Sequence, residues 1–192
     1  MDQNRENECI RQVLHGHSDK FAELVTAYQV RAFNLCHKMM GNREEARDCT
    51  QEAFVRGFEA LGSFRLDSRF STWFYRIVYN ICITRIRKRG RMAPLDQEII
   101  QSTDLHVFNA GPDSLNQEDR RRLLEVARRA LSPDETFLID QFYHEEASVE
   151  DLAVMTGISR SNVKVKLYRA RQKMLKAIQS VLKEEIELWQ IN

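Results

Sequence analysis

The sequence has no long apolar run and no apolar leader, and each absence limits what the protein can be. No stretch approaches the ~18 consecutive apolar residues that a helix needs to span a bilayer. The first residues, MDQNRENECIRQ, are too polar for a secretory signal. With 43% hydrophobic and 30% charged residues, the composition is that of a globular protein. We therefore expect a cytoplasmic protein that does not insert into a membrane.

Cysteine is scarce, and its spacing excludes the usual zinc motifs. The four cysteines (9, 36, 49 and 82) form no CxxC pair, whereas structural zinc sites space their ligands closely along the chain. Cys36 precedes His37, a pair that metal or nucleophilic chemistry can use, but reduced thiols packed in a core are the simpler interpretation. We expect no metal, no cofactor and no catalytic residue.

Strand alternation and internal repeats are absent, whereas helical spacing recurs along the chain. Apolar residues recur 3, 4 and 7 positions apart, which predicts helices over residues 21–39, from 42 to about 61 and from 72 to about 89. Asn42 and Ser71 are the expected N-caps of the second and third helices, with Glu45 as the capping-box partner of Asn42. The pattern predicts an all-α fold.

The formal net charge of +1 conceals three blocks of different charge. Residues 1–92 carry 16 basic and 11 acidic side chains, and residues 120–192 carry 13 basic and 11 acidic ones. Residues 93–119 carry six acids, no Lys or Arg, and two of the three prolines. This pattern predicts two small helical domains, 1–92 and 120–192, joined by a flexible acidic linker at 93–119.

Residues 64–91 combine aromatic rings with a basic end, where eight Arg or Lys stand against one acid. Rings stack on unpaired bases and cations hold phosphates, so the stretch suits opened or single-stranded nucleic acid. One stripe of the predicted helix carries the polar candidates Trp73, Arg76, Asn80, Thr84 and Arg87. The alternative is an amphipathic core helix with a solvated basic end, in which Trp73 is a partly buried core aromatic.

The C-terminal part has the pattern of a helix-turn-helix. Ser132 and Ser148 begin capping boxes, Gly157 lies in a turn, and Ser159 is the expected cap of the last helix. Residues 159–176 hold seven basic residues and no acid. A recognition helix places its first residues at base edges and its cations on flanking phosphates. We expect base-edge contacts from Arg160, Ser161, Asn162, Lys164 and Lys166, and phosphate contacts from Arg169, Arg171 and Lys173. The alternative is a helical hairpin with one basic, solvated face.

Two parts of the chain resemble the extracytoplasmic-function (ECF) sigma factors of bacteria, a group of the sigma-70 family. Their region 2 is similar to DCTQEAFVRGFEAL (48–61) followed by FRLDSRFSTWFYRIVYNICITRIRKRGR (64–91). Their region 4 is similar to LSPDETFLI (131–139) with SVEDLAVMTGISRSNVKVKLYRARQKM (148–174). The resemblance implies a region 2 helical bundle in 1–92 and a region 4 helix-turn-helix in 120–192. It further implies a non-enzymatic protein that binds core RNA polymerase and directs it to promoter DNA.

The resemblance also implies roles for individual residues. Asp48, Gln51 and Glu52 match the helix that docks on the clamp of the polymerase's largest subunit. Region 2 captures a flipped base of the opened −10 element, and region 4 reads the −35 element as duplex. Stacking of roughly 1–3 kcal/mol per base would offset the cost of unstacking. The residues that match the −10 loop and helix are Phe64, Arg65, Phe70, Ser71, Thr72, Trp73, Arg76, Asn80 and Arg87.

Further partners and alternatives follow from the same resemblance. Such sigma factors are commonly held inactive by a cognate anti-sigma factor, often anchored in the membrane. The acidic linker acts either as a plain tether or as a phosphate mimic in the nucleic-acid channel of the polymerase. A stand-alone helix-turn-helix regulator that binds operator DNA without polymerase is the alternative function, although no long heptad seam for a dimer is present. An enzyme built on Cys36 and His37 is a third class.

Overall fold

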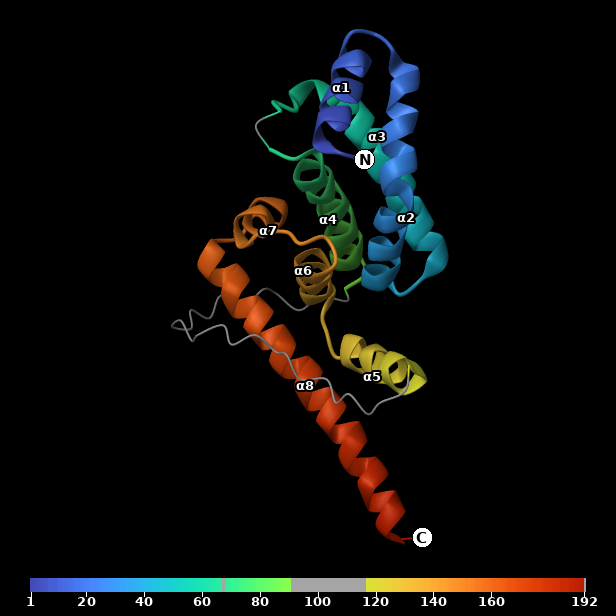
Figure 1. The fold of residues 1–192 in the computed structure, drawn as a ribbon, viewed down its shortest axis with the longest axis vertical. Coiled ribbons are helices and arrows are strands. Elements are labelled where there is room, and N and C mark those ends of the chain that lie inside the picture. The colour runs from blue at the N-terminus through green and yellow to red at the C-terminus, as the bar shows by residue number, and fades with distance from the viewer. Residues whose placement is uncertain (67, 91–116, 192) are drawn as a thin grey trace.

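The computed structural model describes residues 1–66, 68–90 and 117–191, and all their regular structure is helical (Figure 1). The predicted all-α fold is confirmed for this part of the chain. Residues 93–116 of the predicted linker lie outside it, whereas 117–119 begin a helix. Short 3-10 turns cover Ser18–Lys20 and Leu61–Ser63. The α-helices are α1 (Gln3–Leu14), α2 (Phe21–Met40), α3 (Arg43–Ala60), α4 (Phe70–Lys88), α5 (Gln117–Arg129), α6 (Pro133–Tyr143), α7 (Val149–Thr156) and α8 (Arg160–Ile191).

Helices α2, α3 and α4 form the centre of the first half, residues 1–90. α2 ends at Gly41, whose φ of 68° lies in the left-handed region that glycine adopts without a Cβ clash. This turn brings α3 back against α2, and α4 packs against both. Most apolar residues on the inner faces of these helices are buried, and on α4 the rings of Phe70, Phe74 and Tyr75 are each at most 1% exposed.

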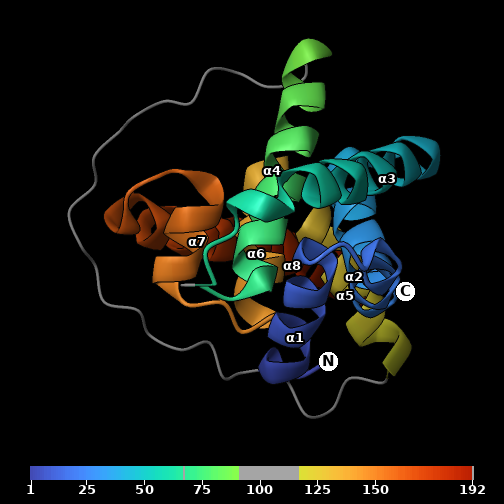
Figure 2. The same cartoon turned by 90° about the horizontal axis from the view of Figure 1, so that it is seen from above.

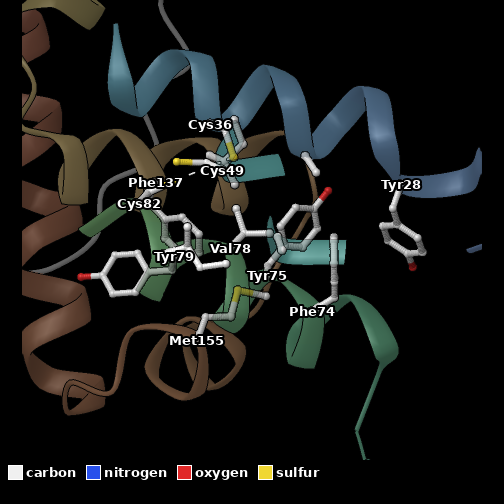
Figure 3. Close-up of a cluster of buried hydrophobic side chains, with 14 of the residues drawn as sticks. Tyr28, Cys36, Cys49, Phe74, Tyr75, Val78, Tyr79, Cys82, Phe137 and Met155 are labelled. Atoms are coloured by element: carbon white, nitrogen blue, oxygen red, sulfur yellow. Dashed lines mark hydrogen bonds between the residues drawn. The ribbon is translucent and has the colours of Figure 1, made fainter. Parts of the chain in front are cut away.

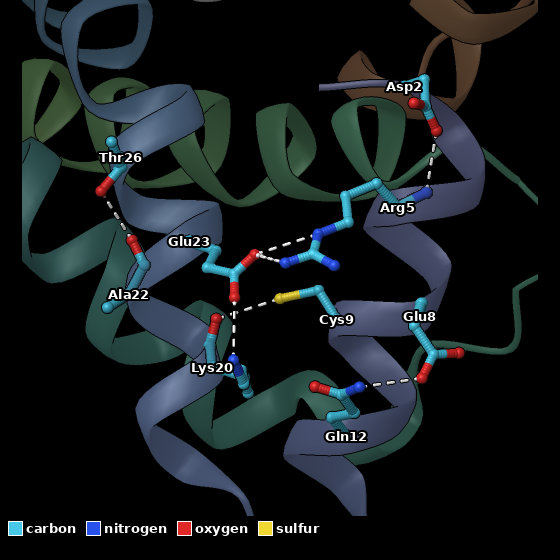
Figure 4. Close-up of polar contacts among 9 residues, drawn as sticks. All are labelled: Asp2, Arg5, Glu8, Cys9, Gln12, Lys20, Ala22, Glu23 and Thr26. Atoms are coloured by element: carbon cyan, nitrogen blue, oxygen red, sulfur yellow. Dashed lines mark hydrogen bonds and ion pairs between the residues drawn. The ribbon is translucent and has the colours of Figure 1, made fainter.

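The apolar spacing does not predict α1, yet α1 forms and packs against α2 (Figure 4). Much of this contact is polar, because Arg5 pairs with Glu23 at 2.7 Å and the Cys9 thiol donates to the carbonyl of Lys20 at 3.0 Å. The hydroxyl of Tyr28 donates to the buried carboxylate of Glu6 at 2.5 Å. Burial and the Glu6 carboxylate both raise the pKa of Tyr28. α1 buries Cys9 and Ile10 in the core but is otherwise mostly polar, so few apolar residues mark it in the sequence.

The predicted start of α4 is wrong by two residues. The helix begins at Phe70, with Arg69 as an N-cap that makes no side-chain capping bond, so Ser71 is not the cap. Asn42 is confirmed as the cap of α3, where it accepts from the backbone N–H of Glu45 at 3.1 Å. No reciprocal bond from Glu45 completes a capping box among the described residues. The Glu45 carboxylate instead pairs with Arg89, the residue that directly follows α4.

Local signals predict the second half, residues 117–191, more accurately. Ser132 and Ser148 both form the expected capping boxes at the starts of α6 and α7. Gly157 ends α7 with a φ of 73°, and Ser159 accepts from the backbone N–H of Asn162 at the start of α8. α7, this turn and α8 make a helix-turn-helix. α5 was not predicted from the sequence and packs against α8.

The two halves touch. α6 and α7 lie beside α4 in Figures 1 and 2, and α6 also packs against α2. The buried apolar side chains of both halves form one contiguous cluster, which is drawn in part in Figure 3. α8 runs away from this junction toward the C-terminus (Figure 1).

Candidate nucleic-acid interface

The residues predicted to bind polymerase lie together on one face of α3. Asp48 and Gln51 are exposed, and Glu52, one turn further along, is half-buried. Val55 and Phe58 extend the face and are 56% and 43% exposed. The sequence analysis did not single out these two apolar residues, although Val55 lies three residues after Glu52 and Phe58 three after Val55, a spacing that continues the same stripe.

Two arginines from the end of α4 hold the carboxylates of this face. Arg85 binds Glu52 through Nη2 at 2.6 Å and lies 3.8 Å from Asp48 through Nη1. Arg89 pairs with Glu45 at the start of α3. The basic end of residues 64–91 is therefore partly committed to α3, where Arg85 positions the acids that the sequence predicts to bind polymerase.

Phe64 and Phe70, both predicted −10 residues, lie inside the first half. They are 5% and 1% exposed and pack edge to face with ring centroids 6.0 Å apart. Trp73 is half-buried and covers both, at 5.4 Å from Phe64 and 5.7 Å from Phe70. Leu66, in the loop between Phe64 and Phe70, has a φ of 59°, which is uncommon for a non-glycine residue. The two phenylalanines thus support the loop from beneath, while Trp73 and the exposed Arg65 lie nearer its surface.

The remaining −10 candidates divide between an open and a covered part of α4. Arg76, Asn80 and Arg87 are exposed along one stripe, as their spacing predicts. Ser71 is half-buried, and Thr72 is 2% exposed. The Thr72 hydroxyl donates to Asp151 of α7 at 3.0 Å. The structure therefore does not bring Thr72 to the same surface as Arg76 and Asn80.

The first turn of α8 presents the −35 candidates to solvent. Arg160, Ser161 and Lys164 are exposed, and Asn162 is half-buried. Arg160 lies 3.3 Å from Glu150 of α7, and both side chains are well exposed, so this pair is weak. This end of the helix therefore projects from the helix-turn-helix with polar and cationic side chains available.

Further along α8 the cations turn toward α6. Lys166 binds Asp134 at 2.6 Å, and Lys173 binds Glu135 at 2.7 Å. Arg171 donates to the hydroxyl of Tyr143 at 2.7 Å, and Arg169 is half-buried. Burial raises the pKa of Asp134, but hydrogen bonds from Lys166 and Ser132 outweigh it and hold the pKa below its ordinary value. Lys166 is thus engaged within the protein rather than directed at a base edge.

The cysteines form no reactive site in the part of the chain that the structure describes. Cys36 is fully buried, whereas the neighbouring His37 is exposed and stacks on Phe33. The thiols of Cys36 and Cys82 lie 3.7 Å apart in the core, and no group of described residues has a metal-binding arrangement. The pair of Cys36 and His37 therefore lacks the shared pocket that an enzyme would need. None of the helices described is long and apolar enough to cross a membrane.

Comparison with known proteins assigns the family. The Sigma-70 region 2 model matches residues 24–92. The chain is 32% identical to the ECF RNA polymerase sigma factor SigW of Bacillus subtilis over 179 residues. These aligned residues cover 90% of this chain and 96% of SigW. This chain is an ECF sigma factor of the sigma-70 family. It directs RNA polymerase to promoters for transcription initiation, and its family is non-enzymatic.

Other relatives agree with this assignment. The sigma factor is 27% identical to the RNA polymerase sigma-H factor of Pseudomonas aeruginosa, over 96% of this chain and 99% of the relative. Its fold is similar to that of CnrH in complex with the cytosolic domain of CnrY, with a TM-score of 0.64, 20% identity, and coverage of 93% of this chain and 99% of the other. The sigma factor RpoE of Bartonella quintana, solved with the anti-sigma factor NepR, gives a TM-score of 0.60 and 23% identity over 83% of this chain and 96% of its own. The ECF resemblance seen in the sequence is confirmed.

Proposed function

We propose that the two halves of this sigma factor read two promoter elements in different states. The first half, with α3 and α4, binds core polymerase and contacts the opened −10 strand, and the helix-turn-helix of the second half reads the −35 element as duplex. The observation that carries the proposal is the exposed polar stripe of α4, which lies over a buried aromatic cluster. The half-buried ring of Trp73 and the cations of one rigid helix surface suit an unpaired base and its phosphates.

On α4, Arg76, Asn80 and Arg87 are the proposed contacts to the opened strand, with Trp73 and Arg65 at the loop. Their exposure along one stripe supports this role. Phe64 and Phe70 are proposed to shape the base-capturing loop by filling its underside, because their burial leaves no ring face for a base. Ser71 and Thr72 join the contact surface only after α7 moves away.

On α8, Arg160, Ser161, Asn162 and Lys164 are the proposed base-edge contacts. They occupy the first turn, the part of a recognition helix that enters the major groove. Arg169 and Arg171 are the proposed phosphate contacts. Lys166 contributes less, because Asp134 holds its ammonium group.

On α3, Asp48, Gln51 and Glu52 are proposed to bind the polymerase, with Val55 and Phe58 as apolar neighbours. The acidic stretch 93–116 is proposed to tether the halves inside the polymerase. Because RpoE of Bartonella quintana was solved with an anti-sigma factor, we expect a cognate anti-sigma factor for this chain, often membrane-anchored in such systems. The proposed location is the cytoplasm, where the polymerase acts.

An Asp48→Arg variant tests the proposed division of labour. Pull-down with bacterial core polymerase should lose at least about 30-fold in affinity, because truncating one partner of a buried charge pair costs 2–5 kcal/mol or more and reversal adds repulsion. Binding of the same variant to a −35 duplex should not change. Asp19→Arg reverses an exposed charge outside α3 and serves as the matched control. Equal loss of polymerase and duplex binding, or wild-type polymerase binding by the variant, would contradict the assignment of α3.

A further inference from the structure

The cations of α8 that face α6 have two kinds of partner. Lys166 and Lys173 bind carboxylates of α6 at 2.6 and 2.7 Å, so each of these charges is matched by an opposite charge. Arg171 instead donates through Nε to the hydroxyl of Tyr143, the last residue of α6, at 2.7 Å. A hydroxyl acceptor orients a guanidinium but does not cancel its charge. Arg171 is therefore held by α6 while its charge stays available for an external anion.

Two aromatic rings hold the same guanidinium. Its central carbon lies 5.4 Å from the ring centroid of Phe142 and 5.5 Å from that of Tyr143. The two rings meet edge to face, with centroids 5.1 Å apart and an interplanar angle of 79°. A cation within about 6 Å of a ring centroid is attracted by the ring. Both rings and the hydroxyl thus act on Arg171 together, although the arginine is only half-buried and Tyr143 is 52% exposed.

Most donors of the Arg171 guanidinium lie outside its bond to Tyr143. That bond uses the N–H group on Nε, and a guanidinium carries four further N–H groups on its two terminal nitrogens. Pairs of N–H groups on this planar fork match two oxygens of a phosphate, a geometry that a lysine ammonium does not offer. Arg171 therefore has the charge and the donors of a phosphate-binding group.

Arg171 lies on the same flank of α8 as Lys164, one of the proposed base-edge contacts. The two residues are seven positions apart, which is nearly two helical turns and about 10 Å along the axis. The major groove is about 12 Å wide, so a cation two turns beyond the residues at the base edges lies near the sugar-phosphate backbone that borders the groove. On the basis of the proposed function, the −35 duplex supplies this phosphate.

We infer that Tyr143, together with Phe142, is a positioning residue that holds Arg171 as a binding site for one backbone phosphate of the −35 duplex. Ordering a long, flexible side chain when DNA binds costs conformational entropy. The rings and the hydroxyl at the end of α6 order Arg171 before DNA arrives, so the phosphate contact forms with less of this cost. Tyr143 therefore contributes to promoter binding although it lies outside the recognition helix.

Nuclear magnetic resonance of the full free chain tests whether Tyr143 holds Arg171. Tyr143→Phe removes the hydroxyl and keeps the ring, so hydrogen exchange at the Nε–H group of Arg171 should become faster than in the wild type. Exchange at Arg43, an exposed arginine of α3, should be the same in both proteins, and the helical circular dichroism should not change. Equal exchange of the Arg171 group in the two proteins would overturn the positioning by Tyr143.

Binding of a −35 duplex by the reconstituted holoenzyme tests the phosphate contact. The probe is a fluorescent duplex that carries the −35 element and ends before the −10 element. Tyr143→Leu removes the ring and the hydroxyl and should weaken binding about three- to tenfold, because Arg171 must then be ordered on binding. Arg171→Ala should reduce the slope of log affinity against log salt by roughly 0.9, the value for one phosphate. In the Arg171→Ala background, Tyr143→Leu should have no further effect, since it acts through the arginine.

Lys164→Ala provides the matched background, because it removes another cation from the same flank of α8. Tyr143→Leu should weaken binding by the same factor with or without Lys164→Ala, as expected for independent sites. An equal loss from Tyr143→Leu with and without Arg171 would overturn the inference and leave Tyr143 a general structural role. Equal affinity of the wild-type holoenzyme for the −35 duplex and for a scrambled duplex would instead refute the proposed function, and hydrogen exchange would still decide whether Tyr143 holds Arg171.

Discussion

α4 and α8 are both basic helices with proposed DNA contacts, and each also forms ion pairs with a neighbouring helix. The carboxylates in these ion pairs differ in how far they are buried. Arg85 of α4 holds Glu52 at 2.6 Å, with the side chains 31% and 30% exposed. Lys166 of α8 holds Asp134 at the same distance, but the Asp134 side chain is only 7% exposed. A carboxylate removed from water depends on its cation far more than one that water still solvates. The Arg85–Glu52 pair between α3 and α4 therefore positions side chains on the protein surface, whereas the Lys166–Asp134 pair between α6 and α8 stabilises the fold.

The comparison shows why a count of basic residues overstates the surface available to DNA. Residues 64–91 carry eight Arg or Lys, yet Arg85 and Arg89 face the acids of α3. Of the seven in 159–176, Lys166 and Lys173 face the acids of α6. The cations left exposed, such as Arg76 and Lys164, lie on the two stripes that carry the proposed contacts.

The largest expected effect comes from removing the buried carboxylate. Asp134→Asn should lower the free energy of unfolding by about 3 kcal/mol, because it leaves Lys166 beside a neutral amide in a partly desolvated site. It also weakens the acceptor of the Ser132 hydroxyl, 2.7 Å away. Urea denaturation followed by circular dichroism measures the change. Asp19→Asn at an exposed position should change stability by less than about 0.5 kcal/mol, and an equal effect of the two variants would remove the distinction between the helices.

The pH dependence of this difference sharpens the test. The pKa of Asp134 is lowered in the folded protein, so its ionised form contributes stability above the unfolded pKa of about 3.9 and loses it as pH falls through the folded value. The stability gap between wild type and Asp134→Asn should be full near neutral pH and shrink below about pH 4. A gap that does not change under acid would show that the ionised carboxylate is not what stabilises α6.

Alanine substitutions of Arg76 and Arg85, both on α4, should have intermediate effects on binding affinity. With saturating polymerase, Arg76→Ala should weaken binding of a single-stranded −10 oligonucleotide about tenfold, because a charge-assisted contact contributes roughly 1.5–3 kcal/mol. Arg85→Ala should leave that affinity unchanged and instead weaken polymerase binding, since Arg85 positions Glu52 and Asp48. Fluorescence anisotropy measures both affinities. If Arg85→Ala weakened strand binding as much as Arg76→Ala, the arginine would have to leave α3 when DNA binds.

The residues in these tests also mark what the sequence predicts and what it does not. The caps Ser132 and Ser148 and the turn at Gly157 depend on neighbours three or four positions away, and the sequence predicts all of them. The pair of Arg85 and Glu52 joins residues 33 positions apart, and the contact of Thr72 with Asp151 joins residues 79 apart. Such partners depend on how helices pack against one another. Spacing along one helix therefore predicts the exposed stripe of α4, but it predicts neither the ion pair of Arg85 with α3 nor the burial of Thr72 under α7.

The smallest expected effect compares Lys164 and Lys166, two residues apart on α8. Each phosphate that a protein cation neutralises adds roughly 0.9 to the slope of log affinity against log salt for duplex DNA. Lys164 is exposed, and an ammonium group at a base edge also offsets the charge of the flanking phosphates, so Lys164→Ala should reduce the slope for a −35 duplex by at most about one. Lys166→Ala should reduce it by much less, because the ammonium already has a carboxylate partner at 2.6 Å. Equal reductions would mean that DNA displaces Asp134 as the partner of Lys166. The α6–α8 pair would then be exchangeable in the DNA complex instead of a fixed part of the fold.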